Sequence, residues 1–181
     1  MHRVSFPKPY ADTVAKLRVP GGFLLVAAFV WLARPTWTSM AVGLPLSVLG
    51  LIVRAWAAGH LEKNLSLAES GPYAFVRNPL YIGTLATAAG LVIASRRWEL
   101  GALFAAVFLL IYLPVVELEE QHLRTLFPSY ADYARRVPRL VPRLVTPGSG
   151  SFRWSLYMRN QEYQALAGFL IGVAVLIWKR A

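Results

Sequence analysis

The sequence contains no cysteine, which excludes disulfide bonds and zinc sites built from thiolates. Charged residues are also scarce. They make up 15% of the 181 residues, whereas 56% are hydrophobic. Because a soluble domain carries about 25% charged residues, this composition argues against one. The chain has no Gly-x-Gly-x-x-Gly sequence either, which argues against the glycine-rich cofactor loop of soluble nucleotide-binding enzymes.

The sequence contains five long apolar runs. A helix needs about 20 residues to cross a bilayer, with about 17 as the lower limit. The second and fourth runs satisfy this, and the other three must borrow flanking residues or thin the bilayer. The alternative, a soluble bundle, would need polar stripes that the fourth run lacks. The runs are Val19–Ala33, Met40–Ala58, Leu80–Ala94, Leu100–Val116 and Ala165–Trp178.

These runs predict an all-α integral membrane protein with five transmembrane helices. The whole chain, residues 1–181, is expected to form one domain, with the last span at about 164–178. Fourteen of the nineteen Lys and Arg residues fall on the side of the N-terminus if every run crosses. Basic residues concentrate in cytoplasmic segments, so we expect the N-terminus, including residues 1–18, in the cytoplasm and the C-terminus outside.

The net charge of +10 suits contact with the anionic lipids of the cytoplasmic leaflet. Nucleic acid could also attract such charge, but the sequence contains no folded basic module or aromatic-basic repeat. Membrane lipids, and not nucleic acid, are therefore the expected partners.

The third and fourth runs are separated only by Ser95–Glu99. So short a link predicts an antiparallel helical hairpin, and glycines such as Gly83 and Gly90 allow helices to approach closely. The hairpin would bring residues 78–81 next to residues 113–120. After the fourth run we expect the helix to continue to about Phe127. A short cytoplasmic helix should then follow, with Pro128 in its first turn and with Tyr130, Tyr133 and Val137 on one face.

The hairpin would place two polar clusters together. Arg77 offers a planar fork for a carboxylate or phosphate, and Asn78 can both donate and accept hydrogen bonds. On the other side lie three glutamates. Glu120 precedes Arg124 by four residues, which predicts a solvated surface pair. Glu119 would then turn toward apolar neighbours and need a cation, such as Arg77 or a ligand ammonium. The alternatives are a basic anchor at the membrane edge and an anionic interfacial patch.

Two further features flank these clusters. Arg54, near the end of the second run, either extends its charge to the interface or has a functional role. The tandem Val-Pro-Arg-Leu sequence at 137–144 predicts an extended basic strap at the level of the lipid headgroups, because proline is excluded from helix interiors. Residues 146–151 are expected to link it to the last span.

Several motifs together resemble one membrane enzyme family. They are Gly71-Pro72-Tyr73, the run from Arg77 to Gly83, Glu119-Glu120, Tyr130-Ala131-Asp132-Tyr133 and Val137-Pro138. The pattern is similar to that of the isoprenylcysteine carboxyl methyltransferases, which are related to membrane phospholipid N-methyltransferases. The resemblance covers about residues 59–142. The chain departs from the pattern at Asn78, where the family has His. An amide still binds, but no proton transfer is expected there.

The resemblance implies S-adenosylmethionine as methyl donor, with S-adenosylhomocysteine as product. It places the donor on the cytoplasmic side, between the start of the third span and the segment after the fourth. It implies catalytic roles for Arg77 and Glu120 and no metal. The implied donor-binding residues are Tyr73, Asn78, Pro79, Tyr81, Gly83, Glu119, Tyr130 and Tyr133.

The expected activity is methyl transfer to a lipophilic small molecule or lipid. The acceptor is either an isoprenylcysteine-type carboxylate or a lipid amine. A carboxylate needs no base, whereas an amine must first lose a proton, for which a glutamate, His60 or His122 is available. The alternative is a non-catalytic lipid-binding or scaffold protein that retains the fold.

Overall fold

The computed structural model describes residues 10, 13–14, 16–143 and 150–180, and in these residues it contains helices and no strand. The prediction of an all-α fold is therefore confirmed for the described part of the chain. Most of the predicted N-terminal lead, and residues 146–149 of the predicted linker, lie outside the described residues.

The first two apolar runs form helices α2 (Arg18–Leu32) and α3 (Trp37–Ala58). The turn between them ends in a capping box. The Thr36 hydroxyl accepts a hydrogen bond from the Ser39 amide at 3.1 Å, and the Ser39 hydroxyl accepts one from the Thr36 amide at 2.9 Å. Because these bonds satisfy amides that have no partner within a helix, they fix where α3 begins.

Helix α4 (Pro79–Ser95) packs against α3 through glycines. A Cβ atom on Gly43 would lie 2.3 Å from the Gly90 carbonyl oxygen, and one on Gly50 would lie 2.5 Å from the Gly83 carbonyl oxygen. The Ser47 hydroxyl also donates to the Thr87 carbonyl at 2.9 Å. The two backbones are therefore in direct contact, as the small residues predict.

The predicted hairpin is present. After Arg96, which has a left-handed φ of 55°, a continuous helix of 29 residues runs from Trp98 to Leu126. Its parts are α5 (Trp98–Val107), the π-helical segment η2 (Phe108–Tyr112) and α6 (Leu113–Leu126). The Tyr10 hydroxyl donates to the Leu110 carbonyl in η2 at 2.9 Å. An α-helix would leave that carbonyl without a donor, since Pro114 has no amide hydrogen.

The remaining elements are short, apart from the last. They are the 3₁₀ turn η1 (Gly71–Ala74), α7 (Tyr130–Arg136), α8 (Trp154–Arg159) and α9 (Tyr163–Arg180). The prediction for Pro128 was wrong in detail, because it precedes the N-cap residue, Ser129, instead of lying in the first turn of α7.

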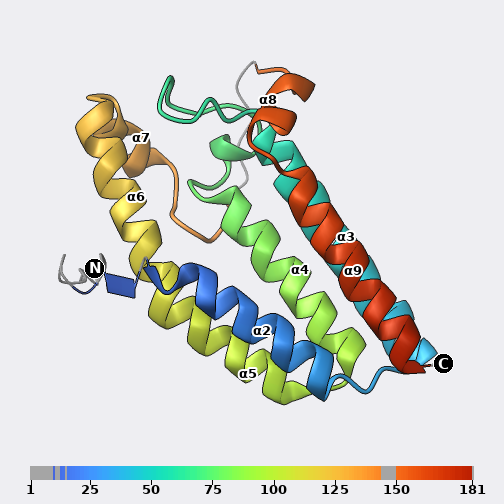
Figure 1. Cartoon of the computed structure of the whole chain (residues 1–181). Helices are drawn as coiled ribbons and strands as arrows, with labels where there is room; N and C mark the ends of the chain where they lie inside the picture. The colour runs from blue at the N-terminus through green and yellow to red at the C-terminus, as the bar shows by residue number, and fades with distance from the viewer. Residues whose placement is uncertain (1–9, 11–12, 15, 144–149, 181) are drawn as a thin grey trace.

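The arrangement in Figure 1 brings the polar segments to one end of the bundle. The end of α3, η1, the start of α4 and α8 lie at that end, and α6 leads to α7 at the same end. Of the described helices, Trp37–Ala58, Trp98–Leu126 and Tyr163–Arg180 are long and apolar enough to cross a membrane, while Val19–Leu32 and Pro79–Ser95 are shorter apolar helices. These helices fit a membrane protein, and the five-span arrangement remains a prediction.

Candidate active site

The hairpin brings the arginine motif and the glutamates into contact, as predicted. The Arg77 guanidinium donates from Nη1 to Glu120 Oε2 at 3.0 Å. The Asn78 amide nitrogen lies 3.4 Å from Glu120 Oε1 and 3.2 Å from the Arg139 carbonyl oxygen. The side chain of Glu120 is 3% exposed, so this contact is buried at the polar end of the bundle.

The prediction that Glu120 is solvated and pairs with Arg124 was wrong. Glu120 instead receives hydrogen bonds from Arg139, from Nε at 3.1 Å and from Nη2 at 2.8 Å. The Arg124 guanidinium lies over the Tyr130 ring, 5.5 Å from its centroid. A buried carboxylate needs paired cations, and Arg77 and Arg139 of the neighbouring segments supply them.

Sequence reasoning missed the role of Arg139. It bridges Glu120 and Glu117, with a distance of 2.6 Å to Glu117 Oε2. Burial opposes the charge of the Arg139 guanidinium, but its bonds to Glu120 and Glu117 outweigh burial and raise its pKa. The Val-Pro-Arg-Leu segment is therefore part of the site. It lies alongside residues 75–77. The Arg77 amide donates a hydrogen bond to the Pro138 carbonyl, and the Arg143 amide donates one to the Phe75 carbonyl, each at 2.9 Å.

Glu119 lies on a different face of α6 and is exposed. It accepts a hydrogen bond from the Tyr81 hydroxyl at 3.1 Å. Tyr81 is buried and makes edge contacts with Phe108 and Tyr112, with ring centroids 6.5 and 6.4 Å apart. The prediction that Glu119 turns toward apolar neighbours was wrong, because its exposed carboxylate accepts from the Tyr81 hydroxyl and lines the cavity described below.

Three further tyrosines, Tyr73, Tyr130 and Tyr133, belong to the site. Tyr130 and Tyr133 are buried with Val137 in one cluster, as their spacing predicts. The Tyr133 hydroxyl donates to the Tyr73 carbonyl at 2.8 Å. Within the described residues the buried Tyr73 hydroxyl has no hydrogen-bond partner. Burial raises the pKa of the Tyr73 and Tyr133 hydroxyls above the ordinary value, so both remain protonated donors at neutral pH.

These residues surround a cavity of about 480 Å³, a volume within the usual range for small-molecule sites. Pro79 and Gly83 are not part of its wall. Pro79 begins α4, and Gly83 faces α3. Eight of the ten predicted site residues line the cavity: Tyr73, Arg77, Asn78, Tyr81, Glu119, Glu120, Tyr130 and Tyr133.

The cavity wall also contains one of the two candidate histidine bases, and two residues that sequence reasoning did not assign to the site. His122 lines the cavity, whereas His60 turns away, with Nδ1 2.9 Å from the Trp56 carbonyl oxygen. Arg54 and Glu162 line it too and form a bidentate ion pair, at 2.5 Å and 2.9 Å. A basic residue in an apolar run was the only signal for Arg54, and nothing in the sequence pattern links it to Glu162, 108 residues later.

Comparison with known proteins gives a family match. A model of a family described as phospholipid methyltransferase matches residues 21–129. The chain is similar to the cobalt-zinc-cadmium resistance protein CzcN of Cupriavidus metallidurans, with 33% identity over 149 residues, which cover 78% of this chain and 68% of that protein.

A second relative is the nickel-cobalt-cadmium resistance protein NccN of Alcaligenes xylosoxydans xylosoxydans. It is 36% identical over 115 residues, which cover 60% of this chain and 54% of that protein. No solved structure matches the chain.

Proposed function

Because the chain belongs to the phospholipid methyltransferase family, we propose that it is an integral-membrane enzyme that transfers a methyl group from S-adenosylmethionine to a lipophilic acceptor. The main support is the cavity of about 480 Å³ at the polar end of the bundle. Two buried polar atoms of its lining residues, the Tyr73 hydroxyl and Arg77 Nε, have no hydrogen-bond partner within the described residues. Both atoms are closed to solvent, so a ligand would bind through the other polar groups that line the cavity.

The lining residues fit the chemistry of the donor. Its ammonium suits Glu119, which is exposed and is oriented by the Tyr81 hydroxyl. Its carboxylate suits the guanidinium of Arg77, which lines the cavity. Tyr130 and Tyr133 offer aromatic edges for the adenine. Glu120 is already held by two arginines, so we assign it the role of positioning Arg77 and not that of binding the ammonium.

The donor, when bound, supplies an electrophilic methyl group carried on a sulfonium. The chain contributes alignment, which is worth up to about 7–11 kcal/mol in well-oriented reactions, and exclusion of water from the reacting groups. The buried Tyr81 ring and Tyr112 form the apolar side of the wall. If the acceptor is an amine, His122 is the base on the cavity wall. A carboxylate acceptor needs no base, and an arginine would align it.

The experiment that tests this function is calorimetric titration of the detergent-purified protein with S-adenosylhomocysteine. We expect saturable binding to the wild-type protein and its loss in Arg77→Ala. Wild-type protein that is folded by circular dichroism and binds no S-adenosylhomocysteine would overturn the proposal. Incubation with radiolabelled donor and a total lipid extract, followed by identification of the labelled product, would then distinguish O-methylation from N-methylation.

The names of the two relatives favour a second, physiological proposal. Both are named for resistance to metal ions, and we propose that this chain contributes to metal tolerance through the membrane component that it methylates. Within the described residues, no group of three or more His, Asp or Glu side chains could hold a metal ion.

A complementation experiment separates this role from that of a non-catalytic scaffold. A bacterial strain lacking its own relative is grown in cadmium with the wild-type chain or with Arg77→Ala. We expect only the wild-type chain to restore growth. Equal protection by a stably expressed Arg77→Ala variant would show that methyl transfer is not required and would favour a lipid-binding or scaffold role.

A further inference from the structure

A buried ion pair joins two apolar helices beside the site. Arg54, in α3, is held by Glu162, just before α9, and also donates to the Thr84 hydroxyl of α4. The side chains of Arg54 and Glu162 are 22% and 8% exposed. Taking two charges out of water costs several kcal/mol per ion, and ionisable residues within membrane helices are usually functional. The pair therefore calls for an explanation beyond stability.

Gly83, in the run from Arg77 to Gly83, leaves the space that the Arg54 side chain occupies. A Cβ atom on Gly83 would lie 2.5 Å from Cγ of Arg54 and 3.1 Å from its amide nitrogen. Any larger residue at position 83 would displace the arginine stem. Gly83, which we expected to bind the donor, thus serves to place Arg54 between α3 and α4.

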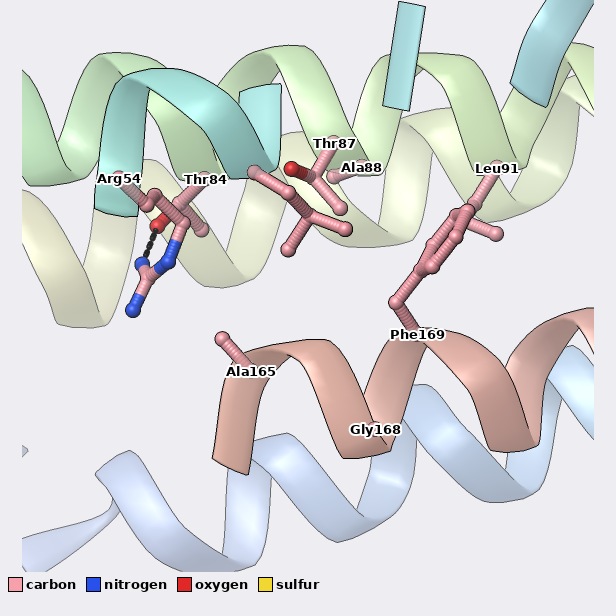
Figure 2. Close-up of a pocket in the computed structure, with 9 residues that line it drawn as sticks. Arg54, Thr84, Thr87, Ala88, Leu91, Ala165, Gly168 and Phe169 are labelled. Carbon is pink, nitrogen blue, oxygen red and sulfur yellow. Dashed lines mark hydrogen bonds between the residues drawn. The ribbon is translucent and has the colours of Figure 1, made fainter. Parts of the chain in front are cut away.

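Arg54 also lies where two cavities meet. One is the polar cavity of the candidate active site, and the other is a groove of about 310 Å³ lined by α3, α4 and α9. Arg54 and Thr84 line both. Figure 2 shows Arg54 and Thr84 at one end of the groove, Leu91 and Phe169 at the other, and Ala165 and Gly168 of α9 facing them. Apart from Arg54 and the two threonines, the groove lining is apolar.

We propose that this groove binds the hydrocarbon chain of the methyl acceptor, and that Arg54 binds an anionic group at the polar end of that chain in place of Glu162. A guanidinium fork binds carboxylate and phosphate in the same bidentate manner in which it now holds Glu162. The ligand is therefore an anionic amphiphile, with either a carboxylate or a phosphate. This inference rests on the proposed function, because it supplies the acceptor side of the same reaction.

The packing of α9 agrees with entry from the lipid. Only Phe169 and Leu176 of α9 are buried, so the helix makes few contacts that a lipid chain would have to break. Gly168 lies in the groove wall, and a Cβ atom there would meet nothing within 4 Å. The space beside Gly168 is therefore open, and a methyl group at this position would displace no other atom.

The test is native mass spectrometry of the protein in a neutral detergent with four amphiphiles of equal chain length. They are lauric acid, dodecyl phosphate, dodecanol and dodecyltrimethylammonium. We expect lauric acid or dodecyl phosphate to bind at least about tenfold more tightly than the other two, the ratio expected for one charge-assisted hydrogen bond. Tighter binding of lauric acid would identify the anionic group beside the chain as a carboxylate, and tighter binding of dodecyl phosphate would identify it as a phosphate. Equal binding would mean that Arg54 recognises the negative charge that both share.

Three variants make the test specific. Arg54→Gln should abolish the preference for the anionic amphiphiles, and Gly168→Leu should weaken binding of all four. Glu162→Gln should strengthen binding of the anions, because it removes their competitor; a merely structural ion pair would give the opposite result. A preference for the cation, unchanged binding in Arg54→Gln, or weaker anion binding in a folded Glu162→Gln protein would overturn the proposal.

Titration with S-adenosylhomocysteine separates this inference from the proposed function. Arg77→Ala should lose the donor product and still bind the amphiphile, whereas Gly168→Leu should do the reverse. Wild-type protein that binds the amphiphile but not S-adenosylhomocysteine would refute the proposed function alone. Wild-type protein that binds S-adenosylhomocysteine and shows no preference among the amphiphiles would refute the groove site alone.

Discussion

Arg77 and Glu120 are 43 residues apart in sequence, yet Arg77 Nη1 lies 3.0 Å from Glu120 Oε2. The contact joins the start of α4 to α6, across the hairpin that α4 and α5 form. Because Arg139 donates to the same carboxylate, Glu120 holds together three segments that are separate in sequence. This carboxylate is the structural centre of the candidate active site.

Glu120→Gln should therefore lower both stability and donor binding. Removing one partner of a buried ion pair costs about 3–5 kcal/mol, and here Arg77 loses its pair with Glu120 while Arg139 keeps its pair with Glu117. We expect a clearly lower thermal unfolding temperature in detergent and at least about tenfold weaker binding of S-adenosylhomocysteine. The matched control is Glu69→Gln, which breaks a surface pair with Arg136 and should change neither measurement. Equal effects of the two variants would contradict the central role of Glu120.

Tyr81→Phe tests the orientation of Glu119. The change removes the hydroxyl that donates to Glu119 at 3.1 Å and keeps the ring that packs against Phe108 and Tyr112. A hydrogen bond to a charged group contributes about 1.5–3 kcal/mol, so calorimetry should show S-adenosylhomocysteine binding weakened by about ten- to a hundredfold. The unfolding temperature should change little. Unaltered affinity would argue that Glu119 does not hold the donor.

Much of the scaffold could be predicted from the sequence because local rules decide it. The link Ser95–Glu99 is too short for anything but a hairpin, and the prediction that residues 78–81 meet residues 113–120 followed from it. The glycines of α3 and α4 marked their contact because only residues without a side chain allow backbones so close. The end of α6 near Phe127 followed from Pro128, which disfavours a helical residue before it.

The inward face of α6 could not be predicted in the same way. The segment η2 has π-helical turns, and we did not predict them from the sequence. Such turns rotate the side chains of α6 about the helix axis relative to those of α5. As a result Glu120 faces Arg77 and Arg139. From the sequence we had expected Glu119, and not Glu120, to be the glutamate that needs a cation. Arg139 and Arg143 occupy equivalent places in the tandem sequence, so only tertiary structure distinguishes the one that pairs with the glutamates. The Arg54–Glu162 pair depends on how α9 docks, and local sequence does not encode that.

The buried Tyr73 hydroxyl predicts a dependence of stability on alkaline pH. Burial raises its pKa in the folded protein, whereas in the unfolded chain it ionises near its ordinary pKa of about 10. Stability is therefore unaffected below about pH 10 and falls as the pH rises further, because only the unfolded state releases the proton, by up to about 1.4 kcal/mol per pH unit. Tyr73→Phe should flatten this fall in thermal unfolding measured from neutral to strongly alkaline pH.

Tyr133→Phe provides the comparison for Tyr73→Phe. Burial also raises the pKa of Tyr133, so this variant should flatten the alkaline fall as well. It also removes the bond to the Tyr73 carbonyl and should lower stability at neutral pH by about 1 kcal/mol. An alkaline fall in Tyr73→Phe as steep as in the wild-type protein would contradict burial of this hydroxyl.

The predicted topology can be tested because the chain has no cysteine, so each introduced thiol is the only one. Arg135 is exposed in α7, near the candidate active site, and Arg34 is exposed in the turn between α2 and α3. We expect a membrane-impermeant maleimide to label Arg34→Cys in intact spheroplasts and to label Arg135→Cys only after permeabilisation. The reverse pattern would place the site outside. If both introduced cysteines were labelled from the same side, the chain would cross the membrane an even number of times between residues 34 and 135, and the predicted topology would be wrong. The excess of Lys and Arg near the site supports the first outcome, because anionic lipid and the positive-inside rule both favour a cytoplasmic position for that end.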